Sequence, residues 1–84
     1  MDILPKVREI MSSISRIDIE ELDSDVRIRE ELGVDSLMAM EIVATCEKHL
    51  DICIDEGQLY DVETIGDFER LIVTIYNEKH GSKN

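Results

Sequence analysis

Apolar residues recur every three or four positions along most of this 84-residue chain, and that spacing constrains its fold more than any other feature. The period is typical of helices that bury one face, whereas a half-buried strand alternates every second residue. A chain of this length can bury one modest core. The sequence therefore predicts an all-α fold in a single domain, residues 1–84.

The first helix is expected over about residues 2–15, where the apolar spacing is regular and the proline falls in the first turn. A long connection, residues 16–34, follows it. Connections of this length inside a small domain are uncommon and are often functional. Because apolar residues are scattered through it, we expect the connection to pack on the core, with a short turn near residues 25–31.

The second helix has a strong start signal. Asp35 is a favourable N-cap residue, and Ser36 opens the apolar-rich run that follows. We expect this helix to end near Leu50 or Asp51. A short extended link then leads to a short third helix at about residues 55–60.

Thr64 is expected to cap the fourth helix, with Asp67 three residues later completing a capping box. The polar tail from about residue 78, which includes His80, is expected to be flexible. Three main helices, one short helix and a long first connection predict a small four-helix bundle.

Acidic residues outnumber basic ones by 20 to 9, which gives a net charge of −11. Most of this charge lies in residues 35–69, where ten acids accompany the single base Lys48. Such a surface repels nucleic acids and anionic membranes, so we expect neither as a partner. It attracts basic patches on other proteins.

The sequence contains no apolar run long enough to span a membrane, and its first residues do not form a signal peptide. Cys46 and Cys53 lack the spacing of metal ligands, so we expect reduced thiols, with Cys46 in the core. These features predict a cytoplasmic protein, which we expect to be a monomer.

The second helix carries two apolar faces where one would serve a simple bundle. One face, centred on Ile42 and Cys46, is expected to point into the core. A second stripe consists of Leu37, Met40 and Ala44. It packs against the connection of residues 16–34 or the short third helix, or it docks a partner protein, and the two interpretations can hold for different residues.

No arrangement of residues predicts catalysis or a metal site. Ser36 lacks the G-x-S-x-G surroundings of a hydrolase nucleophile, and His49 lies more than about three helical turns away. An EF-hand loop starting at Asp51 would need glycine and glutamate where Glu56 and Val62 stand. We therefore expect no enzyme activity, no catalytic residue and no bound metal.

Ser36 has two interpretations at the start of its helix. One interpretation is an ordinary capping residue, because serine is common there. Alternatively, its hydroxyl carries a covalently attached phosphate, which the free backbone N–H groups and the positive end of the helix dipole would favour.

The run LGVDSL at residues 32–37 resembles the phosphopantetheine attachment motif of acyl carrier proteins, whose core is Asp-Ser-Leu. The size, the acidity and the long first connection are also similar to that family. So are the continuation at residues 41–43, the link at 51–56 and the start of the last helix at 64–65. The resemblance covers nearly the whole chain.

This resemblance implies a bundle of three main helices plus a short one, and a serine that a phosphopantetheinyl transferase modifies with coenzyme A. On this chain Ser36 would carry the 4′-phosphopantetheine, which makes it a phosphoprotein. Asp35 would be the motif acid that assists recognition or metal placement at the transferase. The terminal thiol of the arm holds acyl groups as thioesters and delivers them to enzymes of lipid or polyketide biosynthesis.

The resemblance also implies a partner surface. Leu37, Met40 and Glu41 match the part of the second helix that acyl-processing enzymes of the family grip. Glu47 and Glu56 match acidic contacts further along the chain. Basic docking patches on those enzymes would meet these residues, which lie in the most acidic part of the sequence.

Several positions depart from the carriers of primary fatty acid synthesis. Met38 stands where an acid is common, Cys46 where a large apolar residue is common, and Asp55 where a proline is common. These departures favour a specialised carrier. An aminoacyl or peptidyl carrier is one alternative, and an unmodified acidic adaptor that binds through Leu37 and Met40 is another.

The small residues Ala39 and Cys46 leave room on the core face of the second helix. We hypothesise that the interior beside Leu59, Val62 and Ile65 opens to sequester an acyl chain, as in family members of the fatty-acid type. Ordinary tight packing around a small residue is the alternative.

The acids of residues 35–69 should limit stability at neutral pH by self-repulsion. We expect moderate salt or a divalent cation to raise the Tm appreciably, because either one weakens this repulsion. Thermal unfolding followed by circular dichroism at low and moderate ionic strength is the measurement. An unchanged Tm would refute the expectation.

Overall fold

The computed structural model describes residues 3–81 and confirms the all-α prediction. Within these residues the only strand-like pairing is an isolated bridge between Arg27 and Thr64. The elements, in chain order, are α1 (Leu4–Ser15), the 3₁₀ helix η1 (Ile19–Glu21), α2 (Ser36–Leu50), the 3₁₀ helix η2 (Glu56–Asp61) and α3 (Ile65–His80).

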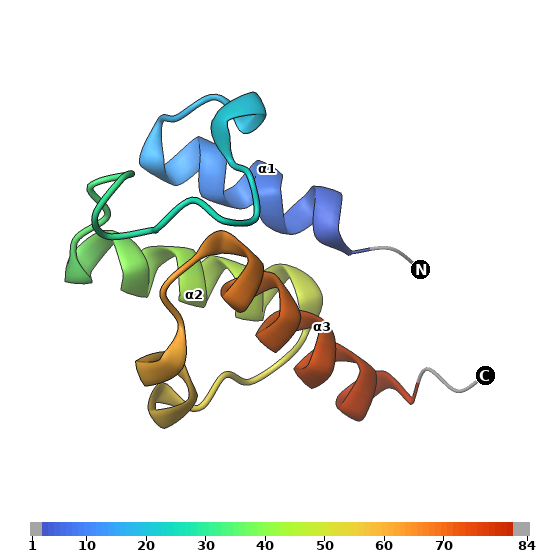
Figure 1. Cartoon of the computed structure of the whole chain (residues 1–84). Coiled ribbons are helices and arrows are strands. Elements are labelled where there is room, and N and C mark those ends of the chain that lie inside the picture. Colours follow the sequence, from blue (N-terminus) through green and yellow to red (C-terminus); the bar gives the residue numbers. More distant parts are fainter. Residues whose placement is uncertain (1–2, 82–84) are drawn as a thin grey trace.

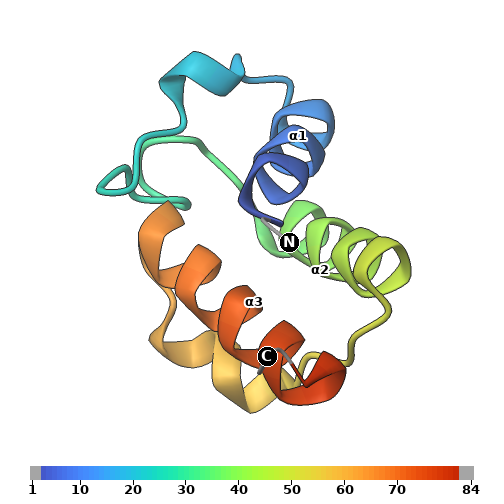
Figure 2. The ribbon, with the colours of Figure 1, turned by 90° about the vertical axis from the view of Figure 1, so that its right-hand side faces the viewer.

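The three α-helices surround one core. α1 and α2 lie side by side, and α3 runs beside them with η2 on its outer side (Figure 1). The long connection crosses the end of the bundle at which α3 begins (Figure 2). The most deeply buried side chains come from every α-helix and from the connection: Val7, Met11, Leu22, Cys46, Ile65 and Ile72.

The predicted helix bounds agree with the structure apart from details at the ends. α1 begins at Leu4, and residue 2 of its predicted span lies outside the described residues. α2 begins at Ser36 and ends at Leu50, as expected. Asp51 follows in the left-handed conformation, with φ of 55°, and its N–H closes the helix on the Glu47 carbonyl.

Backbone hydrogen bonds fasten the connection to the start of α3. Ile65 N–H donates to the Val26 carbonyl at 3.0 Å, and Gly66 N–H donates to the Ser24 carbonyl at 2.8 Å. A Cβ at Gly66 would lie 3.0 Å from that carbonyl oxygen, so the close approach favours glycine. The connection is therefore part of the packed structure, as predicted.

Two features of the connection differ from the sequence-based expectation. The short helix η1 was not predicted, and Ile19 within it is 46% exposed although apolar residues here were expected to pack. The turn forms because Glu21 N–H reaches the Asp18 carbonyl at 2.9 Å, which lets the next residue, Leu22, enter the core. The turn predicted near residues 25–31 is present, with Glu31 N–H donating to Arg27.

The short third helix is present as η2, wound as a 3₁₀ helix. Its N-cap Asp55 accepts from Gly57 N–H at 3.2 Å, and the Gln58 side chain accepts from Asp55 N–H at 3.2 Å. This reciprocal capping satisfies backbone groups that a helix of only six residues would otherwise leave to solvent.

The capping box predicted for α3 is confirmed. Thr64 Oγ1 accepts from Asp67 N–H at 3.1 Å, and the Asp67 carboxylate accepts from the N–H groups of Thr64 and Glu63, each at 3.1 Å. Two such backbone donors stabilise the ionised carboxylate. They lower the pKa of Asp67 below its usual 3.8.

The end of α3 corrects one expectation. His80 was expected in a flexible tail, but it lies in the last helical turn, with Nε2 3.1 Å from the Leu50 carbonyl and 3.2 Å from the Asp51 carbonyl. It therefore satisfies carbonyls at the C-terminal end of α2. Residues 82–84 of the predicted tail lie outside the described residues, and flexibility of the tail stays a prediction.

The cysteines behave as expected from their sequence context. Cys46 is fully buried and Cys53 is exposed, and both are free. Burial, helped by the nearby charge of Glu47, raises the pKa of the Cys46 thiol to about 12. Cys46 is therefore a neutral core residue at physiological pH.

One ion pair joins the two outer α-helices. Arg8 of α1 donates to the carboxylate of Glu69 in α3, and Glu69 is only 6% exposed. The hydrogen bond that Arg8 donates to Glu69 raises the pKa of Arg8. Glu69 is the only buried charged residue in the described part of the chain, and Arg8 is its oppositely charged partner.

Replacing Glu69 by alanine should lower the free energy of unfolding by about 2–3 kcal/mol, because it leaves the half-buried guanidinium of Arg8 without its carboxylate partner. The matched control is Glu9→Ala, which breaks the exposed Lys6–Glu9 pair and should cost under about 1 kcal/mol. Chemical denaturation of both variants measures the difference. Equal losses would mean that the Arg8–Glu69 pair contributes no more than a surface pair.

Replacing Asp67 by alanine should lower the Tm at neutral pH through loss of the two backbone hydrogen bonds. The folded pKa of Asp67 lies below its unfolded value of about 3.8, so its contribution is fully present above that pH. The contribution disappears as pH falls through the lower folded value. Tm measured from pH 7 down to about pH 2.5 should therefore converge for the variant and the unmodified protein; a constant gap would contradict this.

Candidate functional site

The loop before α2 fixes where that helix begins. Gly33 takes a left-handed conformation with φ of +68°, which glycine adopts without strain. Val34 then enters the core at 2% exposure. The turn at Gly33 and the burial of Val34 bring Asp35 and Ser36 to the surface at the N-terminal end of α2.

Ser36 does not cap its helix, so that interpretation of the sequence is wrong. The cap is Asp35, whose Oδ1 accepts from Met38 N–H at 2.9 Å. Ser36 is exposed, and its hydroxyl makes no hydrogen bond with any residue in 3–81. The hydroxyl is therefore free to react.

The surroundings of Ser36 suit a covalently attached phosphate. The first N–H groups of a helix have no partner within the helix, and the helix dipole places positive potential at this end. Asp35 satisfies the N–H of Met38 and leaves those of Ser36 and Leu37 without a partner among the described residues. Phosphate oxygens accept from such groups.

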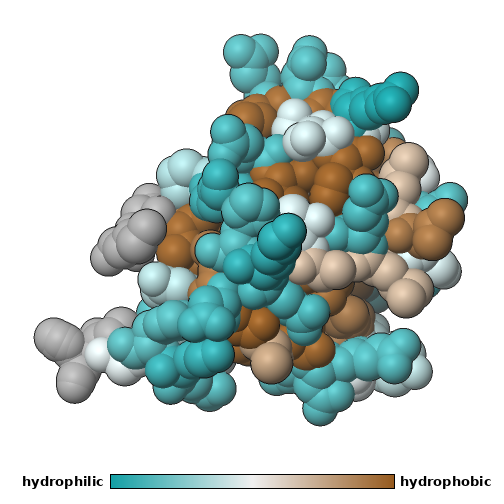
Figure 3. All heavy atoms as spheres, turned by 180° about the vertical axis from the view of Figure 1, so that it is seen from behind, coloured by the Kyte–Doolittle hydropathy of each residue, from teal (hydrophilic) through white to brown (hydrophobic). Residues whose placement is uncertain are grey.

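The second apolar stripe of α2 faces solvent. Leu37 is 76% exposed and Met40 is 68% exposed, and Ala44 lies exposed beside them. Figure 3, which views the molecule from the side of α1 and α2, shows apolar side chains at the surface between hydrophilic ones. The interpretation of this stripe as an internal packing surface is therefore wrong, and we call these three residues the α2 strip.

A groove runs along α2 and is closed on its other side by η2. It brings together four of the residues predicted as attachment or partner-binding residues: Ser36, Met40, Glu47 and Glu56. Leu37 and Glu41 are exposed on α2 but do not line this groove. The predicted residues thus form one continuous region around the start and the outer face of α2.

Glu47 has a structural contact that the sequence did not predict. Its Oε2 accepts from Ile54 N–H at 2.8 Å and so ties α2 to the link before η2. The residue is half-buried. Part of its hydrogen-bonding capacity therefore serves the fold, whereas the exposed carboxylates of Glu41 and Glu56 make no ion pair within residues 3–81.

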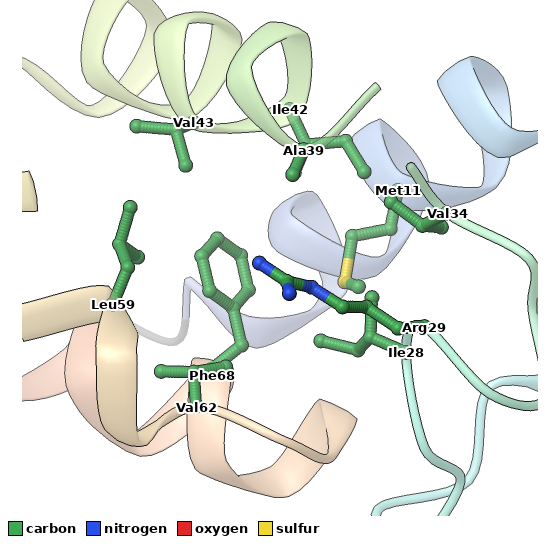
Figure 4. A pocket seen from close by; sticks show the side chains of 10 residues that line it. All are labelled: Met11, Ile28, Arg29, Val34, Ala39, Ile42, Val43, Leu59, Val62 and Phe68. Carbon is green, nitrogen blue, oxygen red and sulfur yellow. The ribbon is translucent and has the colours of Figure 1, made fainter. Parts of the chain in front are cut away.

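A small cavity of about 100 Å³ lies between α2, η2 and α3 (Figure 4). Three of the residues expected around an acyl-binding interior line it: Ala39, Leu59 and Val62. Cys46 and Ile65 do not, because both are packed completely inside the core. The hypothesis of an interior that opens for an acyl chain therefore applies to this cavity and not to the space beside Cys46.

Arg29 also lines the cavity, and the sequence analysis did not predict it as a functional residue. Its side chain reaches from the connection into a space otherwise lined by apolar side chains (Figure 4). The only sequence signal was a basic residue within a connection long enough to be functional.

The sequence analysis expected neither a catalytic nor a metal-binding arrangement. His49 is exposed near the far end of α2. Within residues 3–81 there is no group of three His, Cys, Asp or Glu side chains placed to hold a metal ion. None of the helices in this part of the chain has the length and apolar character needed to cross a membrane.

Comparison with known proteins points to one family. Residues 5–72 match the family described as a phosphopantetheine attachment site. The acyl carrier protein of Phytoplasma australiense is 31% identical over 78 residues, which cover 93% of this chain and 96% of that protein. The polyketide-8 synthase acyl carrier protein 2 of Streptomyces avermitilis is 33% identical over 67 residues, covering 79% and 77%.

A solved structure shares the fold. The solution NMR structure of a holo acyl carrier protein from Geobacter metallireducens superposes with a TM-score of 0.81, covering 100% of this chain and 97% of that one. The sequence identity is 21%, so this likeness concerns the fold alone.

Proposed function

The chain belongs to the phosphopantetheine attachment-site family of acyl carrier proteins, and from that premise we propose that Ser36 is the residue that carries the arm. The protein is an acyl carrier with a covalent 4′-phosphopantetheine, and not an enzyme. The observation that supports Ser36 is its free, exposed hydroxyl next to a helix N-terminus capped by its neighbour, Asp35.

Ser36 would be modified by a phosphopantetheinyl transferase with coenzyme A as donor. Ser36 Oγ attacks the phosphorus that bears the pantetheine, a new Oγ–P bond forms, and the P–O bond of the diphosphate breaks. Adenosine 3′,5′-bisphosphate leaves, and the serine proton passes to a base of the transferase. Once attached, the arm supplies a terminal thiol that holds acyl groups as thioesters.

Asp35 positions this reaction. Because it supplies the cap, the serine side chain is spared that role and the first turn of α2 is held in register. Its carboxylate is exposed beside Ser36, where it is available for recognition by the transferase or for a metal ion bound there.

The α2 strip and the neighbouring acids would form the docking surface for acyl-processing enzymes. Leu37 and Met40 supply exposed apolar area, and Glu41, Glu47 and Glu56 supply negative charge around it. An apolar centre with a charged rim is typical of protein interfaces. Basic patches on the enzymes would be steered toward this region.

The pathway served by this carrier belongs to lipid or polyketide biosynthesis, in keeping with relatives of both general and polyketide type. We favour a specialised carrier, acting as a monomer in the cytoplasm, on the sequence departures at Met38, Cys46 and Asp55. An aminoacyl or peptidyl carrier would share the same arm and differ only in its cargo.

Incubation with coenzyme A and a broad-specificity phosphopantetheinyl transferase should add the mass of one phosphopantetheine per chain. Ser36→Ala should gain nothing, whereas Ser13→Ala, which changes an exposed serine of α1, should be modified as fully as the unmodified sequence. Intact-mass spectrometry measures both. Modification of Ser36→Ala would assign the arm to another residue, and no modification of any variant would favour the unmodified adaptor.

Replacing both Leu37 and Met40 by alanine should raise the KM for a partner such as the transferase by about tenfold, because a few side chains that become buried on contact supply most of the binding energy of an interface. The Tm should barely change, since both side chains are mostly exposed. Ile19→Ala is the matched control, because Ile19 is also an exposed apolar residue but lies in η1. A similar KM for both variants would rule out the α2 strip as the docking surface for that partner.

A further inference from the structure

Arg29 is an exposed residue whose charged end lies beside an apolar cavity. It comes from the connection between α1 and α2. Its guanidinium points into the cavity that Phe68 and Met11 also line (Figure 4). Every other side chain lining that cavity is apolar. At this opening the exposed guanidinium can take an anionic partner that enters from solvent.

The protein itself does not supply that partner. Arg8, Arg27 and Arg70 each form an ion pair, with Glu69, Glu30 and Asp67 respectively. Arg29 forms no ion pair or hydrogen bond with any residue in the described part of the chain, although the protein is strongly acidic. Glu30, which lies next to it in sequence, is already held by Arg27.

The position of Arg29 connects the cavity to the groove that begins at Ser36. Arg29 lines both, together with Ala39, Val43 and Leu59. An arm attached to Ser36 and lying in the groove would therefore present its cargo at the opening where Arg29 stands.

We propose that this cavity takes a short acyl group ending in a carboxylate, with Arg29 binding the carboxylate. The proposal deepens the carrier function and rests on the arm being at Ser36. The volume of about 100 Å³ is smaller than the roughly 150 Å³ cavity that admits benzene, so it suits a chain of a few carbons. Guanidinium and carboxylate match in geometry and pair through two charge-assisted hydrogen bonds.

The phosphate of the arm is a less suitable partner for Arg29 than the cargo. Ser36, to which the phosphate would be bonded, does not line the cavity into which the guanidinium points. The N-terminal N–H groups of α2 lie next to Ser36 and already provide donors for a phosphate. A carboxylate at the far end of the arm can enter the cavity.

The test compares two cargoes of equal carbon number on the full chain. A transferase attaches succinyl or butyryl arms from coenzyme A analogues in which an amide replaces the thioester, and intact mass confirms the loading at Ser36. NMR then follows the side-chain N–H of Arg29 and the methyl groups of Val43 and Leu59. We expect the succinyl arm to shift all three sets of signals, and the butyryl arm to leave the Arg29 signal unchanged.

Arg29→Gln should reduce the cavity population of the succinyl arm by about tenfold, seen as loss of the methyl shifts. Arg16→Gln is the matched control, because Arg16 is an exposed arginine outside the cavity without an ion pair among the described residues, and it should keep the shifts.

Three outcomes would overturn the inference. Equal shifts from succinyl and butyryl arms, or succinyl shifts that persist in Arg29→Gln, would mean that Arg29 does not select the cargo. An Arg29 shift already complete with the unacylated arm would assign its partner as the phosphate. In all of these the proposed function stands, whereas failure of Ser36 to be loaded would remove that function and this inference with it.

Discussion

The hydrogen bond from Met38 N–H to the Asp35 carboxylate is the interaction on which the site depends. It sets the first residue of α2 and so determines which residue stands exposed at the positive end of the helix. The bond is possible because Gly33 turns the chain in a left-handed conformation and Val34 is held in the core. A shift by one residue would rotate α2 by about 100° and move its buried face away from the core.

α2 has one face buried in the core and another face exposed to solvent. Its inner face, with Ile42 and Cys46, is part of the core, while Leu37 and Met40 on its outer face are left in water. Exposed apolar side chains add nothing to stability, and the acids around them repel one another. The exposed apolar area and the repulsion between acids are unfavourable in the isolated chain. A partner with an apolar, basic surface would reduce both by covering them. This pattern fits the proposed docking surface, where contact with a partner would offset the exposure of these side chains.

Local sequence signals predicted most of the fold. Helical spacing located the three α-helices, and Thr64 with Asp67 predicted the capping box because both members act within four residues of each other. The η1 turn and the contact of His80 with the end of α2 were missed. His80 and Leu50 are 30 residues apart, and no local pattern records such a contact. At the site, Asp35 and Ser36 were predictable for the same local reason, but the structural bond of Glu47 to the link before η2 was not.

The sequence by itself determined the helices, the acidity of residues 35–69 and the serine at the start of α2, because each depends on residues close together in the chain or on simple composition. Only the tertiary structure decided that the α2 strip is exposed and that Cys46 is packed tightly, away from the cavity. It also decided that the Arg29 side chain reaches into that cavity. These outcomes depend on how α1, η2 and α3 are placed around α2. Burial is a property of all packed neighbours together, so no single segment of sequence specifies it.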